Sequence, residues 1–281
     1  MSTESQSPAG FPRPVVDAAP MPEGLGLTIS ARLETCMSRL DDPALPGGRV
    51  VHEVRKELKR ARALLRLSSD VLPTRHFEKR CAEAARRLAH LRDADAIAET
   101  LLRLRSRADP CHLEALDALS RALSEDRRAN AAAGLPRPLA EGVVDTLRVI
   151  RADVERLDFE AMDERAIGAG LAEAWAETAR AFRRVLEQPV LPRFHDFRKV
   201  VKRELYQREL CGLPLDKHER AMLKKLADVL GELQDLDVLR AKLRAIDAWR
   251  GPVRQLVKQT IRELKARALR LGLARYPEGL S

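Results

Sequence analysis

Apolar residues recur at helical spacing through most of the chain, and the first such pattern, "LTISARLETCMSRL", begins just after Leu25. β-Branched residues are scattered and never alternate with polar ones over the length of a strand. Short breaks rich in Pro and Gly separate the patterned segments. We therefore expect an all-α protein whose short loops make neighbouring helices antiparallel.

The breaks divide the chain into predicted helices. The first runs from Leu25 to the break "DDPALPGG", and Thr74 is a candidate N-cap for the third. The remaining helices are expected at about 49–70, 74–107, 111–133, 139–157, 163–188, 191–211, 215–249 and 252–271. Residues 1–24 are rich in Pro, Ser and Gly, which predicts a disordered N-terminal tail.

Two segments of the chain occur twice in the same order. "VHEVRKELKRAR" near residue 52 matches "FHDFRKVVKREL" near residue 195, at an offset of 143. "LAHLRDADAI" matches "LGELQDLDVL" at an offset of 142. These matches predict two homologous halves, residues 25–133 and 139–281, joined by a linker at 134–138 within one domain. We expect about four helices in each half, related by a pseudo-twofold axis that brings the two basic segments together.

Helical geometry separates an apolar face from a basic stripe in both copies. In the first copy, Val54, Leu58, Ala61 and Leu65 form the apolar face. The opposite stripe contains no acid, and its members are His52, Arg55, Lys56, Lys59, Arg62 and Arg66. A solvent-exposed helix face usually mixes Glu with Lys, so this stripe favours a bound anion over an ordinary wetted surface.

The second copy is the weaker cation surface. His195, Arg198, Lys199 and Lys202 occupy the same stripe, with Phe197 and Val201 on the apolar side. In place of Arg62 and Arg66 the second copy has Leu205 and Glu209, and Tyr206 joins the stripe. An anion that contacts both copies is therefore expected to bind asymmetrically.

The histidines and the Asp pairs leave alternatives open. Both histidines are expected at the starts of their helices, where they either donate to an anion or hydrogen-bond into the bundle. The pairs Asp93/Asp95 and Asp235/Asp237 lie mid-helix. We expect these acids to support basic side chains across a helix interface rather than to perform acid–base chemistry.

The overall charge agrees with an anionic partner. The formal net charge is +9 and the isoelectric point is about 9.7, which favours polyanions without specifying a fold. The four cysteines are far apart, so reduced thiols are expected rather than disulfides or a zinc site. No apolar run is long enough to span a membrane and no secretory signal is evident, which predicts a cytoplasmic protein.

The doubled His-x-x-Arg-Lys motif, with Leu-x-Asp-x-Asp downstream, resembles the CHAD family, the conserved-histidine α-helical domain. The resemblance covers nearly all of the chain after the N-terminal tail. It implies two four-helix bundles around a basic central cavity that binds inorganic polyphosphate, with possible association with polyphosphate granules. Carried over to this sequence, the binding residues are His52, Arg55, Lys56, Lys59, Arg60, Arg62, Arg66, His195, Arg198, Lys199, Lys202 and Arg203.

Two other functional classes are alternatives to polyphosphate binding. A nucleic-acid-binding helical protein is the first alternative, but the basic segments contain almost no aromatic residues for base stacking. A metal-dependent phosphohydrolase is the second, but Lys56 stands where a zinc-binding HExxH motif needs its second histidine. The sequence therefore predicts a binding protein that is not an enzyme and has no cofactor.

Overall fold

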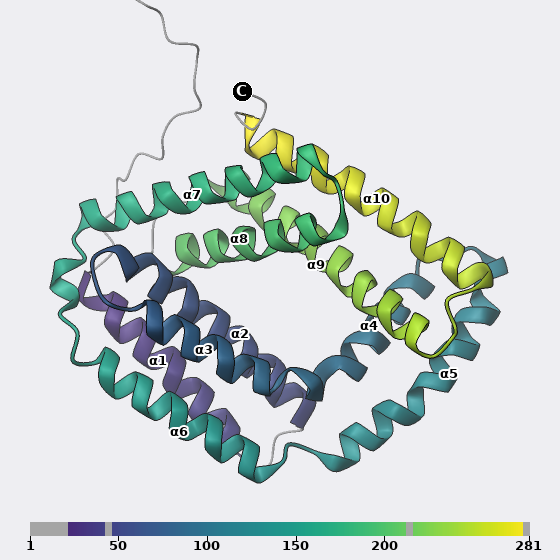
Figure 1. Cartoon of the computed structure of the whole chain (residues 1–281), viewed down its shortest axis with the longest axis horizontal. Helices are drawn as coiled ribbons and strands as arrows, with labels where there is room; N and C mark the ends of the chain where they lie inside the picture. The colour runs from purple at the N-terminus through teal and green to yellow at the C-terminus, as the bar shows by residue number, and fades with distance from the viewer. Residues whose placement is uncertain (1–21, 43–46, 212–215, 278–281) are drawn as a thin grey trace, which may run out of the picture.

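The computed structural model describes residues 22–42, 47–211 and 216–277. These residues form ten α-helices and three short 3-10 helices, and no strand occurs among them, which confirms the predicted all-α class (Figure 1). The predicted tail lies outside the described residues up to position 21, and helix α1 (Pro22–Asp41) already includes its last three residues.

The other helices follow the predicted order. Their bounds are α2 (Gly47–Leu67), α3 (Arg75–Arg87), α4 (Asp93–Arg105), α5 (Pro110–Ala133), α6 (Arg137–Val154), α7 (Glu164–Glu187), α8 (Leu191–Leu210), α9 (Lys217–Ala245) and α10 (Gly251–Arg275). Four of them carry Pro in the first two positions, where a missing N–H costs no hydrogen bond. Gly134 follows α5 with a φ of 63°, a conformation that glycine adopts without strain.

The prediction of a single helix over residues 74–107 is wrong. The chain forms α3, a 3-10 turn at Ala89–Arg92 and then α4. Leu88, before the turn, is buried in one core, whereas Ile97 of α4 is buried in another. The change of direction therefore lets the chain pass from one core to the other. Thr74 does precede α3, but its hydroxyl donates to the carbonyl of Leu65 at 2.6 Å instead of capping the helix.

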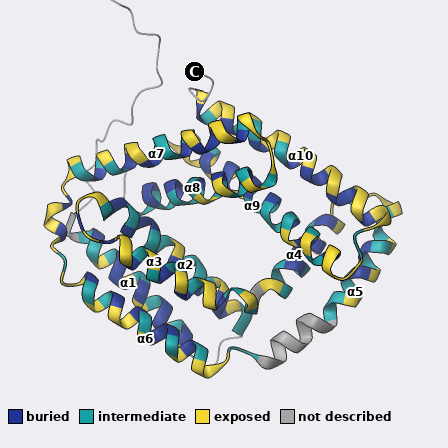
Figure 2. Ribbon diagram, viewed as in Figure 1, coloured by how far each residue is buried: buried dark blue, intermediate teal, exposed yellow. Residues whose placement is uncertain are grey.

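Two hydrophobic cores hold the described helices together, and both draw on the two halves of the sequence. The first contains residues of α1, α2, α3, α6 and the start of α7. The second contains residues of α4, α5, α8, α9, α10 and the end of α7. Helix α6 begins within residues 134–138 and packs with the first core, whereas α4 and α5 precede that segment and pack with the second. Figure 2 shows the buried faces of both groups.

The two basic helices, α2 and α8, pack directly against each other near the middle of the molecule (Figure 1). At their C-terminal ends, the buried amide of Gln207 donates to the carbonyl oxygen of Ala63 at 2.9 Å. The prediction that the repeated histidines lie at the starts of their helices is wrong, because neither occupies the first turn. His52 lies five residues after the start of α2, and His195 lies four residues after the start of α8, so neither reaches the free N–H groups of its helix.

Candidate functional site

The apolar faces predicted for α2 and α8 are confirmed. Val54, Leu58 and Ala61 are fully buried in the first core, and Phe197 and Val201 are fully buried in the second. Because these residues hold each helix against its own core, the basic stripes must face elsewhere. The charged groups that meet near the packed helices form the candidate site.

A group of cations from both helices surrounds Lys59. Burial is the largest influence that lowers the pKa of this lysine, from the ordinary 10.5 to about 8. Four neighbouring cations add their repulsion, and they are Arg198, Arg55, Lys202 and Arg62. We call Arg55, Lys59, Arg62, Arg198 and Lys202 the central cation cluster. Three of its members lie on α2 and two on α8, so the structure brings parts of the two sequence repeats together.

Lys59 is both exposed and surrounded. Its side chain is accessible to solvent, yet protein lies around it closely enough that burial depresses its pKa. Lys59 therefore carries an exposed charge among four other cations. Such a concentration of like charge attracts an anion.

Two members of the cluster lack a partner among the described residues. Lys59 and Arg198 form no ion pair or hydrogen bond there, and the Nε of Arg198 is buried. Arg55 only donates to the carbonyl oxygen of Ala85, at 3.3 Å. Like charges at i,i+4, as in Arg55/Lys59 and Arg198/Lys202, each cost about 0.2–0.5 kcal/mol. The cluster therefore stores repulsion that a bound anion would relieve.

Acids from other helices neutralise part of the basic stripe. Arg62 pairs with Glu78 of α3 at 3.1 Å, and Lys202 lies 3.6 Å from Asp228 of α9. The interpretation that the first stripe is unneutralised is therefore wrong for Arg62. Sequence reasoning missed Glu78 and Asp228 because each lies on a separate helix, and no local pattern places it beside the stripe.

Three further predicted site residues are engaged at the edge of the cluster. Arg66 of α2 and Arg203 of α8 both contact the carboxylate of Glu177 on α7. Arg60 donates to the buried Glu57 at 2.7 Å and lies over the ring of Tyr206, 5.8 Å from its centroid. These three arginines therefore already have acidic partners, unlike Lys59 and Arg198 of the cluster.

Three others lie on the surface beside acids of their own helices. His52 and Lys56 lie 3.8 and 3.6 Å from Glu53. Lys199 donates to Asp196 at 3.0 Å, with both side chains more than half exposed. Exposed pairs of this kind contribute at most about 1 kcal/mol, so an anion can displace the acid at small cost.

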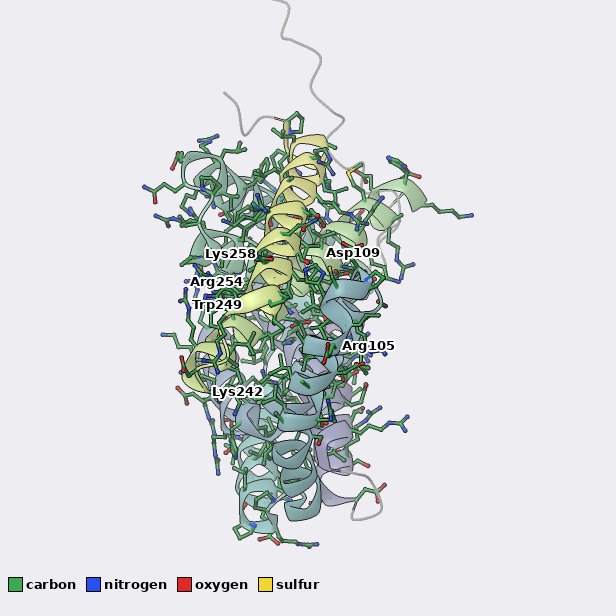
Figure 3. All side chains as sticks on the ribbon, turned by 90° about the vertical axis from the view of Figure 1, so that its right-hand side faces the viewer. Arg105, Asp109, Lys242, Trp249, Arg254 and Lys258 are labelled. Atoms are coloured by element: carbon green, nitrogen blue, oxygen red, sulfur yellow. The ribbon has the colours of Figure 1, made fainter. Side chains whose placement is uncertain are left out.

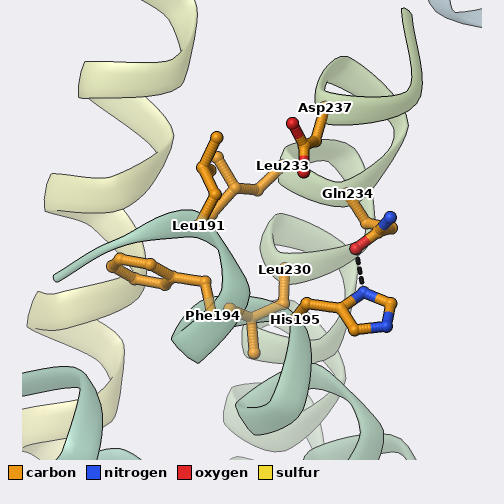
Figure 4. Close-up of a pocket in the computed structure, with 7 residues that line it drawn as sticks. All are labelled: Leu191, Phe194, His195, Leu230, Leu233, Gln234 and Asp237. Carbon is orange, nitrogen blue, oxygen red and sulfur yellow. Dashed lines mark hydrogen bonds between the residues drawn. The ribbon is translucent and has the colours of Figure 1, made fainter. Parts of the chain in front are cut away.

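His195 hydrogen-bonds into the bundle, which was one of the two alternatives left open. Its Nδ1 meets the Oε1 of Gln234 on α9 (Figure 4). The hollow beside it, lined also by Phe194 and Leu230, is too small to hold a water molecule. Because Nδ1 donates to the amide oxygen, the neutral ring presents only an acceptor at Nε2. His195 can therefore donate to an anion only when it is protonated.

The Asp pairs behave largely as expected. Asp235 of α9 accepts a hydrogen bond from Arg103 of α4 at 2.6 Å and so links two helices. Asp237 instead pairs with Arg240 of its own helix at 2.6 Å. The charge of Asp93 raises the pKa of Arg55, although burial, the larger effect, leaves that pKa below its ordinary value. These contacts support basic side chains, as the sequence predicted.

Other exposed cations lie far from the cluster, on the outer helix α10. Arg254 and Lys258 are exposed one turn apart, near Trp249 (Figure 3). Neither forms an ion pair with any residue in the described ranges. They offer a control surface of the same charge on an exposed helix face.

Neither a metal-binding cluster nor a membrane-spanning helix occurs within the described ranges. No group of three or more His, Cys, Asp or Glu side chains is placed to hold a metal ion among these residues. None of the helices described is long and apolar enough to cross a membrane.

Replacing Lys59 with Met is expected to stabilise the protein in the absence of anions. The substitution removes the repulsion of Lys59 with Arg55 and with Arg62. At about 0.2–0.5 kcal/mol for each pair, the melting temperature should rise by about 1–3 °C. The pKa of Lys59 is lower in the folded protein than in the unfolded chain. Its charge therefore opposes folding by the full amount below pH about 8, and by less as the pH rises toward 10.5. Thermal melts should show the gain at pH 7 and a smaller one near pH 10. An equal or lower melting temperature for Lys59→Met at pH 7 would contradict the stored repulsion.

The fold and the site together define an all-helical protein with a cluster of cations where two central basic helices meet. The CHAD domain model matches residues 33–244 of the chain. The match starts within α1, ends near the end of α9 and includes both basic helices. The chain therefore belongs to the CHAD domain family. A comparison with curated proteins gave no match.

Proposed function

We propose that this protein binds inorganic polyphosphate, without catalysis, through the central cation cluster. The observation that carries the proposal is the position of Lys59, which is open to solvent, unpaired among the described residues and surrounded by four other cations. Membership of the CHAD family supports it, since the resemblance implies a helical scaffold for polyphosphate. Association with polyphosphate granules would follow from such binding.

The chemistry of the cluster favours a ligand made of phosphate alone. Arginine offers paired N–H donors to phosphate oxygens, and lysine offers a compact positive charge. A nucleic acid would also need rings on which bases can stack. The ring of Tyr206 on α8 is half-buried and already lies beneath the guanidinium of Arg60. The cluster therefore suits a flexible chain of phosphates better than a chain of bases.

Binding is expected to weaken steeply as salt is added. If about five phosphates are contacted, the slope of about −0.7 per contact known for single strands gives about −3.5. Affinity for long-chain polyphosphate should then fall about 100-fold between about 50 and about 200 mM salt. Titration by calorimetry or fluorescence anisotropy at the two concentrations measures the slope. A slope near zero would overturn an ionic site of this size.

Competition separates the proposal from the alternatives. Duplex DNA at equal phosphate concentration should fail to displace bound polyphosphate. If the DNA displaces it, the nucleic-acid alternative is favoured. Incubation with polyphosphate and Mg²⁺ or Mn²⁺ should release no phosphate, and release that depends on the protein would show a phosphohydrolase instead.

A further inference from the structure

Glu177 of α7 lies between the two basic helices at one edge of the central cation cluster. Its Oε2 atom is 3.8 Å from a guanidinium nitrogen of Arg66 and makes a shorter contact with Arg203. One carboxylate oxygen therefore meets one arginine from each sequence repeat. Arg66 follows Arg62 by one helical turn, so the Glu177 contact lies one turn beyond the cluster along α2.

The Glu177 carboxylate is ionised and only partly buried. Burial by itself raises the pKa of Glu177, but the hydrogen bond from Arg203 and the charges of Arg66 and Arg180 hold the pKa below its ordinary value. The side chains of Arg66, Arg203 and Glu177 keep 23%, 21% and 28% of their exposure, so solvent reaches part of each, although the Arg203 nitrogen that meets Glu177 is itself buried. A soluble anion can therefore compete with the carboxylate for the two arginines.

We infer that Glu177 is an internal competitor that sets how long a polyphosphate chain the site can hold, an inference that rests on the proposed function. Its Oε2 occupies a position that a phosphate oxygen would take between the two guanidinium groups. A short chain binds to the central cation cluster alone. A longer chain reaches Arg66 and Arg203 only by displacing the carboxylate, so Glu177 weakens the binding of long chains selectively.

The test is Glu177→Gln, titrated with tripolyphosphate and with long-chain polyphosphate. The matched control is Glu173→Gln, which removes the same charge one turn earlier on α7, where Glu173 pairs with the half-exposed Arg180 at 2.5 Å. We expect E177Q to bind long chains about tenfold more tightly, the gain of about one freed charge-assisted contact. Its affinity for tripolyphosphate, and both affinities of E173Q, should stay within about twofold of the parent protein.

The outcomes distinguish the inference from the proposed function. The affinity for both ligands could rise equally in E177Q, or the affinity for long chains could rise equally in E177Q and E173Q. Either result would show a general effect of charge and would overturn the role of Glu177 in selecting chain length. Unchanged long-chain affinity in E177Q would overturn it also. If the parent protein binds neither ligand, the proposed function itself fails.

A second variant keeps the test valid if E177Q is poorly folded. Glu177→Asp retains the charge but shortens the side chain, so it should hold the two arginines less well and strengthen long-chain binding in the same direction by a smaller factor. Long-chain polyphosphate should also raise the melting temperature of E177Q more than that of the parent. The absence of both effects would contradict the inference.

Discussion

Polyphosphate binding is expected to weaken at least about 100-fold when Lys59 and Lys202 are both replaced by Glu. A hydrogen bond to a charged group contributes about 1.5–3 kcal/mol, so losing two such contacts costs about 3 kcal/mol or more, which is a factor of about 100. The two residues lie on different helices but act on the same point, since the charge of Lys202 lowers the pKa of Lys59. Glu at position 202 would also lie near Asp228, which now faces the lysine at 3.6 Å.

The matched control is Arg254→Glu/Lys258→Glu on α10. Each double variant changes the formal charge by four units, from +9 to +5, so a difference between them reports location rather than net charge. We expect the control to lose less than about threefold, because isolated exposed charges are screened by salt. Equal losses in both variants, measured by titration at one salt concentration, would show that the central cation cluster is not the site.

The sequence predicted the helices well because their apolar faces are local patterns, but it did not predict which core each helix joins. The segment around Leu88 matches the segment around Leu230, yet the chain turns at the first and continues as helix α9 through the second. The difference arises from packing: Leu88 and Ile97 lie in separate cores, whereas Leu230 and Leu239 share one. A periodic pattern cannot distinguish these cases, because both segments are equally helical in isolation.

The candidate site was predictable in its cations but not in its counter-charges. The repeat and the helical stripes identified all five members of the central cation cluster from residue spacing alone. The acids beside the basic stripes come from α3, α7 and α9, far away in sequence, so only the folded chain shows that Arg62 and Arg66 are partly neutralised. The predicted pseudo-twofold relation of the halves stays a prediction. Arg66 pairs with an acid, Glu177, whereas its counterpart in the second copy, Glu209, is itself an acid and pairs with Arg220. The charges at these two positions are therefore asymmetric, as the sequence indicated.

Glu204 of α8 is expected to be among the most important single residues for stability, although no motif identifies it. The carboxylate is fully buried and accepts a hydrogen bond from the hydroxyl of Tyr276 at 2.8 Å. Arg208 and Arg275 donate to it at 3.2 and 3.3 Å, and their side chains keep only 5% and 10% of their exposure. Burial raises the pKa of Tyr276 well above its ordinary value, so its hydroxyl stays protonated and continues to donate.

Replacing Glu204 with Ala should lower the free energy of unfolding by about 3–5 kcal/mol, because it leaves the buried Arg208 without its carboxylate partner and Arg275 with the more distant Glu219, at 3.9 Å. Urea denaturation followed by circular dichroism measures the loss. The control is Glu209→Ala on the same helix, where the pair with Arg220 is 61% exposed on the arginine side and should contribute less than about 1 kcal/mol. A loss below about 1 kcal/mol for Glu204→Ala would show that the network is not needed. A large loss would mean that the end of α10, beyond the residues that the family model matches, fixes the helix that carries Arg198 and Lys202.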